Sequence, residues 1–376
     1  MKAIGSIGER RLFLTTALAT RRQQQVALAI ATVAAVGFLA AIPFARVPLA
    51  KFPAFIPSYE AALFFIDLIT AVLLLEQFVR LRSIPILVLA SGYLFDALLI
   101  VPHALTFPGA FAPTGLLGAK EQTTAWLYVF WHGGFPLFVV AYALLRRKKR
   151  NVPESLTSNP YKAILVAIVA VAMLAICLSA LTTVGHDLLP IVMRGSDYSL
   201  LVKKGVSPAV WALTLVAMVL LWQRPQRVID LWLMLVMWIW LFDIALAAVI
   251  GSSRFDLGFY VGRIFGLVAA SFLLIMLLGE MARLYFSALG AVADIEQRFA
   301  ALASARAPNP VSGVREKPEN FVRRQNISHY RELLATGQID DKRRRAIEKL
   351  LAEEEALLAR DAASTIGRGP QQDTPH

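Results

Sequence analysis

Eight stretches of the chain are apolar over most of their length and are separated by short polar or proline-containing segments. A helix needs about 20 mostly apolar residues to cross the hydrocarbon core of a membrane, and all but one of the stretches come close to that length. The predicted spans are 26–44, 59–79, 84–105, 125–145, 161–184, 208–222, 228–250 and 257–278, of which 208–222 is the shortest. The pattern predicts an all-α, polytopic integral membrane helix bundle of about eight spans with a cytoplasmic helical tail.

The composition agrees with a membrane protein. Hydrophobic residues make up 57% of the chain and charged residues 17%, whereas soluble domains average about 45–50% and about 25%. The only cysteine, Cys177, lies inside an apolar run. A disulfide framework and a cysteine-based metal site are therefore excluded.

The net charge of +12 is concentrated in the short loops of the membrane part. Residues 1–280 contribute +10 and the last 96 residues +2. Loops on the side of the N-terminus hold fifteen basic residues against seven on the other side. Basic loops stay on the cytoplasmic side, so we predict a bacterial inner membrane protein with both termini in the cytoplasm. No basic patch with interleaved aromatic residues occurs, which argues against nucleic-acid binding.

Several ionisable residues lie inside the predicted spans, where each costs at least about 2.5–3.5 kcal/mol to insert. A rise of about 1.5 Å per residue places a set of them in the outer half of the bilayer. This set is Asp67, Asp96, His132, Asp243 and Arg263, with His103 and His186 at its outer rim. The layer predicts a polar, ligand-binding cavity that opens to the periplasm and is closed below by apolar residues.

Each of these residues also has a purely structural interpretation. Asp243 and Arg263 lie at similar depth on consecutive spans, which allows them either to neutralise each other or to bind a ligand. The ring of His132 is suited to a hydrogen bond with a neighbouring helix. Two acidic residues near the inner boundary are expected to form interfacial ion pairs with nearby arginines, Glu76 with Arg80 and Asp230 with Arg227.

The histidines allow a further hypothesis. His103 and His132 lie at matched depth on consecutive spans, which is the geometry of a membrane b-type haem, or of a divalent metal held together with a carboxylate. We expect no cofactor, with haem as the alternative, and a visible spectrum of the purified protein distinguishes the two.

Three blocks of sequence carry a family likeness. They are IPSYEAALFFIDLITAVLLLEQF from Ile56, ALTFPGAFAPTGLLGA from Ala104 and AWLYVFWHGGFPLFVVAYALL from Ala125. The chain resembles, over roughly residues 25–285, the bacterial membrane-associated sensor (MASE) domain of the fourth class. That resemblance implies an integral-membrane input module, usually followed by a diguanylate cyclase. The Gly-Gly-Asp/Glu-Glu-Phe signature of a cyclase is absent, and 96 residues are too few for that domain or for the ATP-binding part of a kinase.

The residues after the last span form a separate, helical region. Met281, Leu284, Tyr285, Leu289 and Val292 recur at helical spacing and predict a continued signalling helix that pairs in a dimer. Two amphipathic helices follow, with Gly337 placed to end the first and Asp340 to cap the second. The predicted parts are a cytoplasmic segment at 1–24, a membrane sensor domain at 25–280, a signalling helix at 281–304, a linker at 305–318, a helical hairpin at 319–360 and a disordered tail at 361–376.

The leading functional hypothesis is a sensor without an enzyme of its own. A periplasmic or membrane signal passes through the last span to a separate cytoplasmic partner, with the bilayer and a second copy of the chain as further partners. A transporter that uses the buried carboxylates is the first alternative, although no convincing inverted repeat occurs. A haem-binding redox membrane protein is the second. No catalytic signature is present.

Overall fold

The computed structural model describes residues 17–52, 54–147, 159–223, 227–251, 253–306, 318–335 and 341–366. The described residues are helical apart from turns and isolated bridges. They belong to two compact units, Met1–Gly290 and Ala291–His376. The predicted all-α membrane bundle is confirmed, and the first unit contains it.

Among the described residues, seven helices are long and apolar enough to cross a membrane. They are α2 (Arg21–Ala41, extended by the 3-10 turn Ile42–Phe44), α3 (Phe55–Leu81), α4 (Ile84–Thr106), α5 (Thr123–Arg147), α7 (Pro160–Thr183), α10 (Val228–Ile244, continued by the π-helical turn η3, Ala245–Ile250) and α11 (Leu257–Arg306). The predicted spans agree with these helices to within a few residues at each end, except that α11 continues beyond residue 278, where the last predicted span ends.

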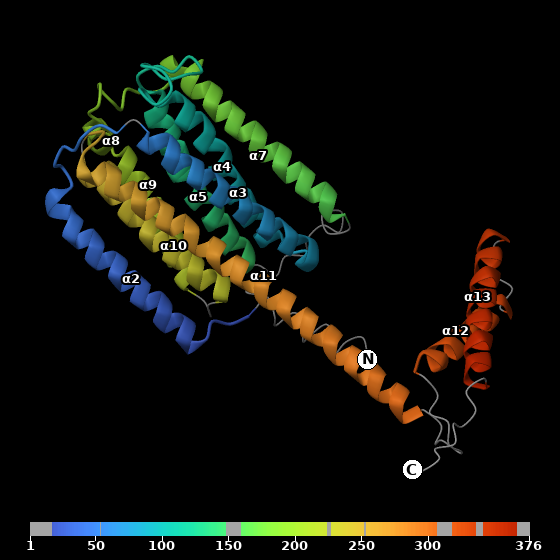
Figure 1. Ribbon diagram of the computed structural model, residues 1–376. Coiled ribbons are helices and arrows are strands. Elements are labelled where there is room, and N and C mark those ends of the chain that lie inside the picture. The colour runs from blue at the N-terminus through green and yellow to red at the C-terminus, as the bar shows by residue number, and fades with distance from the viewer. Residues whose placement is uncertain are drawn as a thin grey trace, which may run out of the picture. The chain divides into compact units, whose positions relative to one another are not determined.

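The predicted sixth span is the helix α9 (Val206–Trp222), whose 17 residues are fewer than the others have. At about 1.5 Å per residue it is about 26 Å long, a little less than the hydrocarbon core. It nevertheless runs through the bundle beside α5 and α10 (Figure 1). The short helix α8 (Ser199–Lys203) precedes it and packs against η3.

The two ends of the bundle are held by contacts between loops. At one end, here called the distal end, the loop residues 45–52, 107–122, 184–198 and 253–256 meet. Leu49 N donates to the carbonyl of Phe255 at 2.9 Å, and Arg254 N donates to that of Ser196 at 3.0 Å. At the opposite, proximal end, Val228 N donates to the carbonyl of Ala17 at 2.9 Å. Helix α2 therefore begins at the proximal end, and α11 begins at the distal end.

Helix α4 lies among α3, α5 and α7 and is buried along most of its length (Figure 1). Close approach to α5 depends on small residues and on aromatic packing. A side chain at Gly134 would begin 2.2 Å from the ring of Phe95, so only glycine fits there. Tyr93 and Phe135 meet edge to face with ring centroids 4.9 Å apart. This dense aromatic core fixes the helices that carry the polar residues described below.

Helix α2 lies at the edge of the bundle and buries only Ala27 fully. Its attachments are to α10. The indole Nε1 of Trp238 donates to the carbonyl of Ala31 at 3.2 Å, and Phe38 stacks on Phe242 at 4.5 Å. The helix is therefore held by a few specific contacts in addition to the lipid around it.

Replacing Trp238 with phenylalanine is expected to weaken the docking of α2. Loss of one hydrogen bond from a partly buried indole costs about 1 kcal/mol. Thermal unfolding in lipid nanodiscs, compared with the exposed Trp222→Phe as control, measures the effect. Equal melting temperatures of the two variants would show that the Trp238 bond contributes nothing.

The second unit contains a pair of helices that form a hairpin. Helices α12 (Pro318–Ala335) and α13 (Asp341–Ile366) pack together. Polar contacts join them: Arg323 pairs with Asp361, and Asn326 Nδ2 donates to Glu354 at 3.0 Å. The second helix runs to Ile366, beyond the predicted end at residue 360, since the pairing of Asp361 with Arg323 holds a further turn. The predicted signals at Gly337 and Asp340, most of the linker and residues 367–376 lie outside the described residues.

Candidate functional site

A buried polar contact joins α5 to α10. His132 Nε2 lies 3.2 Å from Oδ2 of Asp243, and its Nδ1 lies 3.1 Å from the carbonyl oxygen of Tyr128. The side chains of His132 and Asp243 are 2% and 1% exposed. The expected hydrogen bond of His132 to a neighbouring helix is therefore present, and its partner is a carboxylate.

A second buried pair joins α3 to α4 nearer the distal end. His103 Nδ1 lies 2.7 Å from Oε1 of Glu60, and both side chains are almost fully buried. The indole of Trp131 lies between the two pairs, with its ring 5.8 Å from that of His103 and 4.5 Å from that of His132. The two histidines therefore belong to one polar layer that is packed around an aromatic side chain.

Arg263, on α11, does not form an ion pair with Asp243 within the described part of the chain. Its Nη1 donates to the carbonyl of Phe259 at 3.1 Å, and its guanidinium lies 3.7 Å from the centroid of the Phe259 ring. It also lies over the ring of Tyr128 at 5.6 Å. The interpretation of Asp243 and Arg263 as a mutual pair is thus not supported, because Asp243 is directed to His132.

Two glycines bring α11 against Asp243. A side chain at Gly262 would begin 3.1 Å from Oδ1 of Asp243 and 2.9 Å from Cβ of Ala247. One at Gly266 would begin 2.9 Å both from Oδ2 of Asp243 and from the hydroxyl of Tyr59. The polar layer is therefore in close contact with the first turns of α11.

Asp67 and Asp96 form a separate group on α3 and α4. Their side chains are buried, and they interact electrostatically with each other and with Tyr93. Oδ1 of Asp96 has no hydrogen-bond partner among the described residues. The structure thus brings together His132, Asp243 and Arg263 of the predicted set and leaves these two aspartates beside each other.

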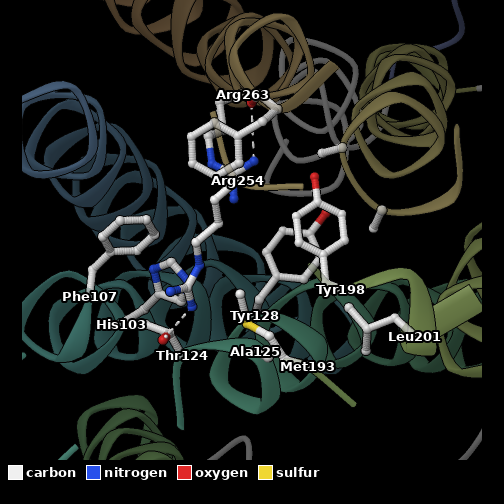
Figure 2. Close-up of a pocket in the computed structure, with 13 residues that line it drawn as sticks. His103, Phe107, Thr124, Ala125, Tyr128, Met193, Tyr198, Leu201, Arg254 and Arg263 are labelled. Carbon is white, nitrogen blue, oxygen red and sulfur yellow. Dashed lines mark hydrogen bonds between the residues drawn. The ribbon is translucent and has the colours of Figure 1, made fainter. Parts of the chain in front are cut away.

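A small pocket of about 40 Å³ lies on the distal side of the polar layer. Figure 2 shows Arg254, Arg263, Tyr128, Tyr198, Thr124 and His103 around it. Of the predicted ligand-binding set only Arg263 lines this pocket, together with His103 from the predicted rim. The other predicted residues do not line it.

Two residues of the distal loops complete the pocket wall. Arg254 Nη2 donates to Oγ1 of Thr124 at 2.9 Å, and its guanidinium lies 4.9 Å from the centroid of the Phe107 ring. Burial lowers the pKa of Arg254 to about 10, and the positive charge of Arg263 adds to this effect. The hydroxyl of Tyr198 donates to the carbonyl of Ser253 at 3.0 Å, and burial raises the pKa of Tyr198. The loop around Arg254 is thereby fixed over the pocket.

Several of these residues do not follow from sequence reasoning alone. Arg254 lies in a short loop, where a basic residue is common in membrane proteins, and Glu60 lies at the very start of a predicted span. The sequence does contain one indication of the proximity of Glu60 to His103. These two residues lie on consecutive, antiparallel spans, and both are close to the predicted outer surface of the membrane. Matched depth could therefore have indicated this pair, although the same criterion favoured Arg263 rather than His132 as the partner of Asp243.

The proximal end holds a different polar cluster. Asp230 is fully buried, pairs with Arg146, and accepts a hydrogen bond from the hydroxyl of Tyr142 at 2.7 Å. The expected interfacial ion pair of Asp230 with Arg227 is corrected here. Arg227 donates its backbone N–H to Asp230 at 2.9 Å, and the ion pair of the Asp230 side chain is with Arg146 on α5. The predicted pair of Glu76 with Arg80 is present at the surface.

Metal or haem ligation by His103 and His132 stays a hypothesis. Both ring nitrogens of His132 lie within hydrogen-bond distance of an oxygen, so ligation there would first have to break one of these contacts. Within the described residues, no group of three or more histidine, cysteine, aspartate or glutamate side chains is arranged to hold a metal ion.

The comparison with protein families decides the identity of the membrane unit. The model of MASE4, described as membrane-associated sensor, integral membrane domain, matches residues 50–285, well over half of the chain. The chain belongs to the MASE4 family. No curated protein and no solved structure matches it.

The MASE4 match covers α3 to the middle part of α11 and leaves α2 outside it, whereas the resemblance was expected to begin near residue 25. Every residue of the polar layer and of the pocket lies inside the matched range. The chain is therefore a membrane sensor domain, and the site described above is part of that domain.

Proposed function

We propose that this MASE4 protein receives a signal at its distal end and relays it through α11 to a separate cytoplasmic protein, without catalysis of its own. The observation that carries the proposal is the position of Arg263, Gly262 and Gly266. All three lie on the first turns of α11, against the polar layer and the pocket. A change at the site therefore acts directly on this helix.

Helix α11 is suited to carry such a change. It is a single helix from Leu257 to Arg306 and includes both the last span and the predicted signalling helix. A ligand shifts the position of such a helix when it binds two arrangements of the bundle with different affinity. The close contacts at Gly262 and Gly266 favour two discrete arrangements, since packed interfaces do not deform continuously.

The later part of α11 presents an apolar stripe that fits a second copy of the chain. The stripe consists of Tyr285, Ala288, Val292, Ile295, Phe299 and Leu302, all of which are exposed. The alternating spacing of three and four residues is the period of a left-handed coiled coil. In a parallel dimer the same positions of both copies face each other, so we propose that α11 pairs with itself.

The hairpin is the proposed contact to the cytoplasmic partner. Its two helices pack on each other and bury Ile327, while Val322, Leu350 and Leu357 remain exposed. A two-helix hairpin buries too little apolar surface to be stable alone, so a partner surface would complete it. The excess of basic residues in the proximal loops supports an orientation with the distal end in the periplasm and both termini in the cytoplasm.

A cysteine scan tests the relay helix. Single cysteines at positions 285–302, introduced into a Cys177→Ser background, are oxidised in native membranes and the crosslinked dimers are quantified on gels. We expect maxima at positions 285, 288, 292, 295, 299 and 302, since these face the second copy. Crosslinking that is absent, or uniform along the helix, would contradict the proposed pairing of α11.

A further inference from the structure

Two arginines, Arg254 and Arg263, line the pocket at the distal end. Among the described residues, neither Arg254 nor Arg263 forms an ion pair with an acidic side chain. Arg254 donates to the Thr124 hydroxyl at 2.9 Å, and Arg263 donates to the Phe259 carbonyl at 3.1 Å. The charged neighbour that acts most strongly on Arg254 is Arg263 itself, a like charge.

The acidic groups of the surrounding helices have other partners. Glu60 faces His103 at 2.7 Å, and Asp243 faces His132 at 3.2 Å. Asp256 accepts hydrogen bonds from two backbone N–H groups at the start of α11, those of Ser253 at 3.2 Å and of Phe259 at 2.7 Å. The two guanidinium groups, one buried and one half-buried, thus share a small pocket. The carboxylates of Glu60, Asp243 and Asp256 contact other groups.

A third donor is directed at the same space. The hydroxyl of Tyr128 is buried, lines the pocket and has no hydrogen-bond partner among the described residues. Figure 2 shows Tyr128 close to the two arginines, and the guanidinium of Arg263 lies 5.6 Å from the centroid of the Tyr128 ring. An unpaired buried hydroxyl costs free energy, and a bound acceptor removes this cost.

The pocket lies directly below an open cleft. This cleft has a volume of about 640 Å³ and is lined by Lys51 from one distal loop and by Lys120 and Glu121 from another. Phe107 and Arg254 line both spaces, so the stacked pair of these two side chains separates them. Movement of Arg254 away from Phe107 would join the cleft to the pocket.

We propose that this site binds a small organic oxyanion, with one carboxylate or phosphate group held between Arg254 and Arg263 and by the Tyr128 hydroxyl. Guanidinium groups match the geometry of these oxyanions by paired hydrogen bonds. A pocket of about 40 Å³ has room for one such group, and the remainder of the ligand lies in the cleft beside Lys51 and Lys120. The inference rests on the proposed function, since it names the signal that the sensor receives.

Binding is measured directly, so the result does not depend on the relay through α11. The full chain is placed in nanodiscs of zwitterionic phosphatidylcholine, and citrate and inorganic phosphate are titrated by isothermal calorimetry. We expect at least one of them to bind, with an affinity that falls as salt rises. Arg254→Gln and Arg263→Gln should each weaken binding at least tenfold, and Tyr128→Phe several-fold without loss of the ring.

Arg46→Gln is the matched control. Arg46 also lies at the distal end, where its Nε donates to the carbonyl of Ile250 at 2.9 Å, but it does not line the pocket. Its replacement should leave binding unchanged.

A parallel experiment uses nanodiscs with added phosphatidylglycerol. If phosphatidylglycerol raises the thermal stability of the wild-type protein but not that of Arg254→Gln or Arg263→Gln, the oxyanion is supplied by a lipid headgroup.

Two results would overturn the site. One is the absence of binding of citrate, phosphate and the anionic lipid to the wild-type protein. The other is binding that is equally strong in the wild type, in the two arginine variants and in Tyr128→Phe, with all variants folded as judged by thermal unfolding.

Discussion

Replacing Asp230 with alanine is expected to lower the free energy of unfolding by about 3–5 kcal/mol, since removal of one partner from a buried ion pair leaves the other charge uncompensated. The carboxylate of Asp230 is fully buried, and it is shared by Arg146, Tyr142 and the backbone N–H of Arg227. These contacts join α5 to the first turn of α10. The change therefore weakens the proximal end of the bundle as a whole.

Thermal unfolding in nanodiscs, followed by circular dichroism, measures this effect. The exposed pair of Glu76 and Arg80 on α3 provides the control, because loss of a surface ion pair costs about 0–1 kcal/mol. Asp230→Asn retains an acceptor for Tyr142 and should fall between the two. If Asp230→Ala melts at the same temperature as Glu76→Ala, the buried cluster does not stabilise the bundle.

Replacing Gly266 with valine is expected to displace α11 from α10 and to destabilise the bundle by about 1–3 kcal/mol, the usual cost of overpacking. The first carbon of the new side chain would lie 2.9 Å from both Asp243 Oδ2 and the Tyr59 hydroxyl. Both neighbours are buried polar groups. The helix must therefore move, which should also alter disulfide crosslinking between copies at position 295.

The same helix offers a matched control for Gly266. A side chain at Gly279 would meet nothing within 4 Å, so Gly279→Val adds the same groups to α11 without a clash. We expect wild-type stability and crosslinking for this variant. Equal behaviour of Gly266→Val and Gly279→Val would show that the contact of α11 with Asp243 is not tightly packed.

The helices themselves follow closely from the sequence. Long apolar stretches have few alternatives to a membrane span, because every backbone polar group must be satisfied within the segment. The stretch 208–222 is the shortest of the predicted spans, and α9 is correspondingly shorter than the seven long apolar helices among the described residues. The two helices of the hairpin were predictable for a different reason, because their apolar residues recur at helical spacing.

The sequence predicts the depth of the site residues in the membrane, but it does not predict which of their side chains contact each other. Depth along a helix follows from residue number, so His132, Asp243 and Arg263 were expected at one level. The partner of a side chain depends on how each helix is rotated about its axis, which apolar spans encode weakly. Asp243 consequently faces His132 on α5 and not Arg263 on α11. Arg254 was missed because its position results from long-range loop contacts, such as that with Ser196.

In the proposed relay, the polar layer controls the position of α11 in the paired protein. Spin labels at Ile295→Cys, in a Cys177→Ser background in nanodiscs, report the distance between the two copies by pulsed electron paramagnetic resonance. We expect His132→Ala and Asp243→Asn to shift this distance distribution, whereas Phe65→Ala, on the exposed surface of α3, leaves it unchanged. Distributions of folded His132→Ala and Asp243→Asn that superimpose on that of the unaltered protein would contradict the account.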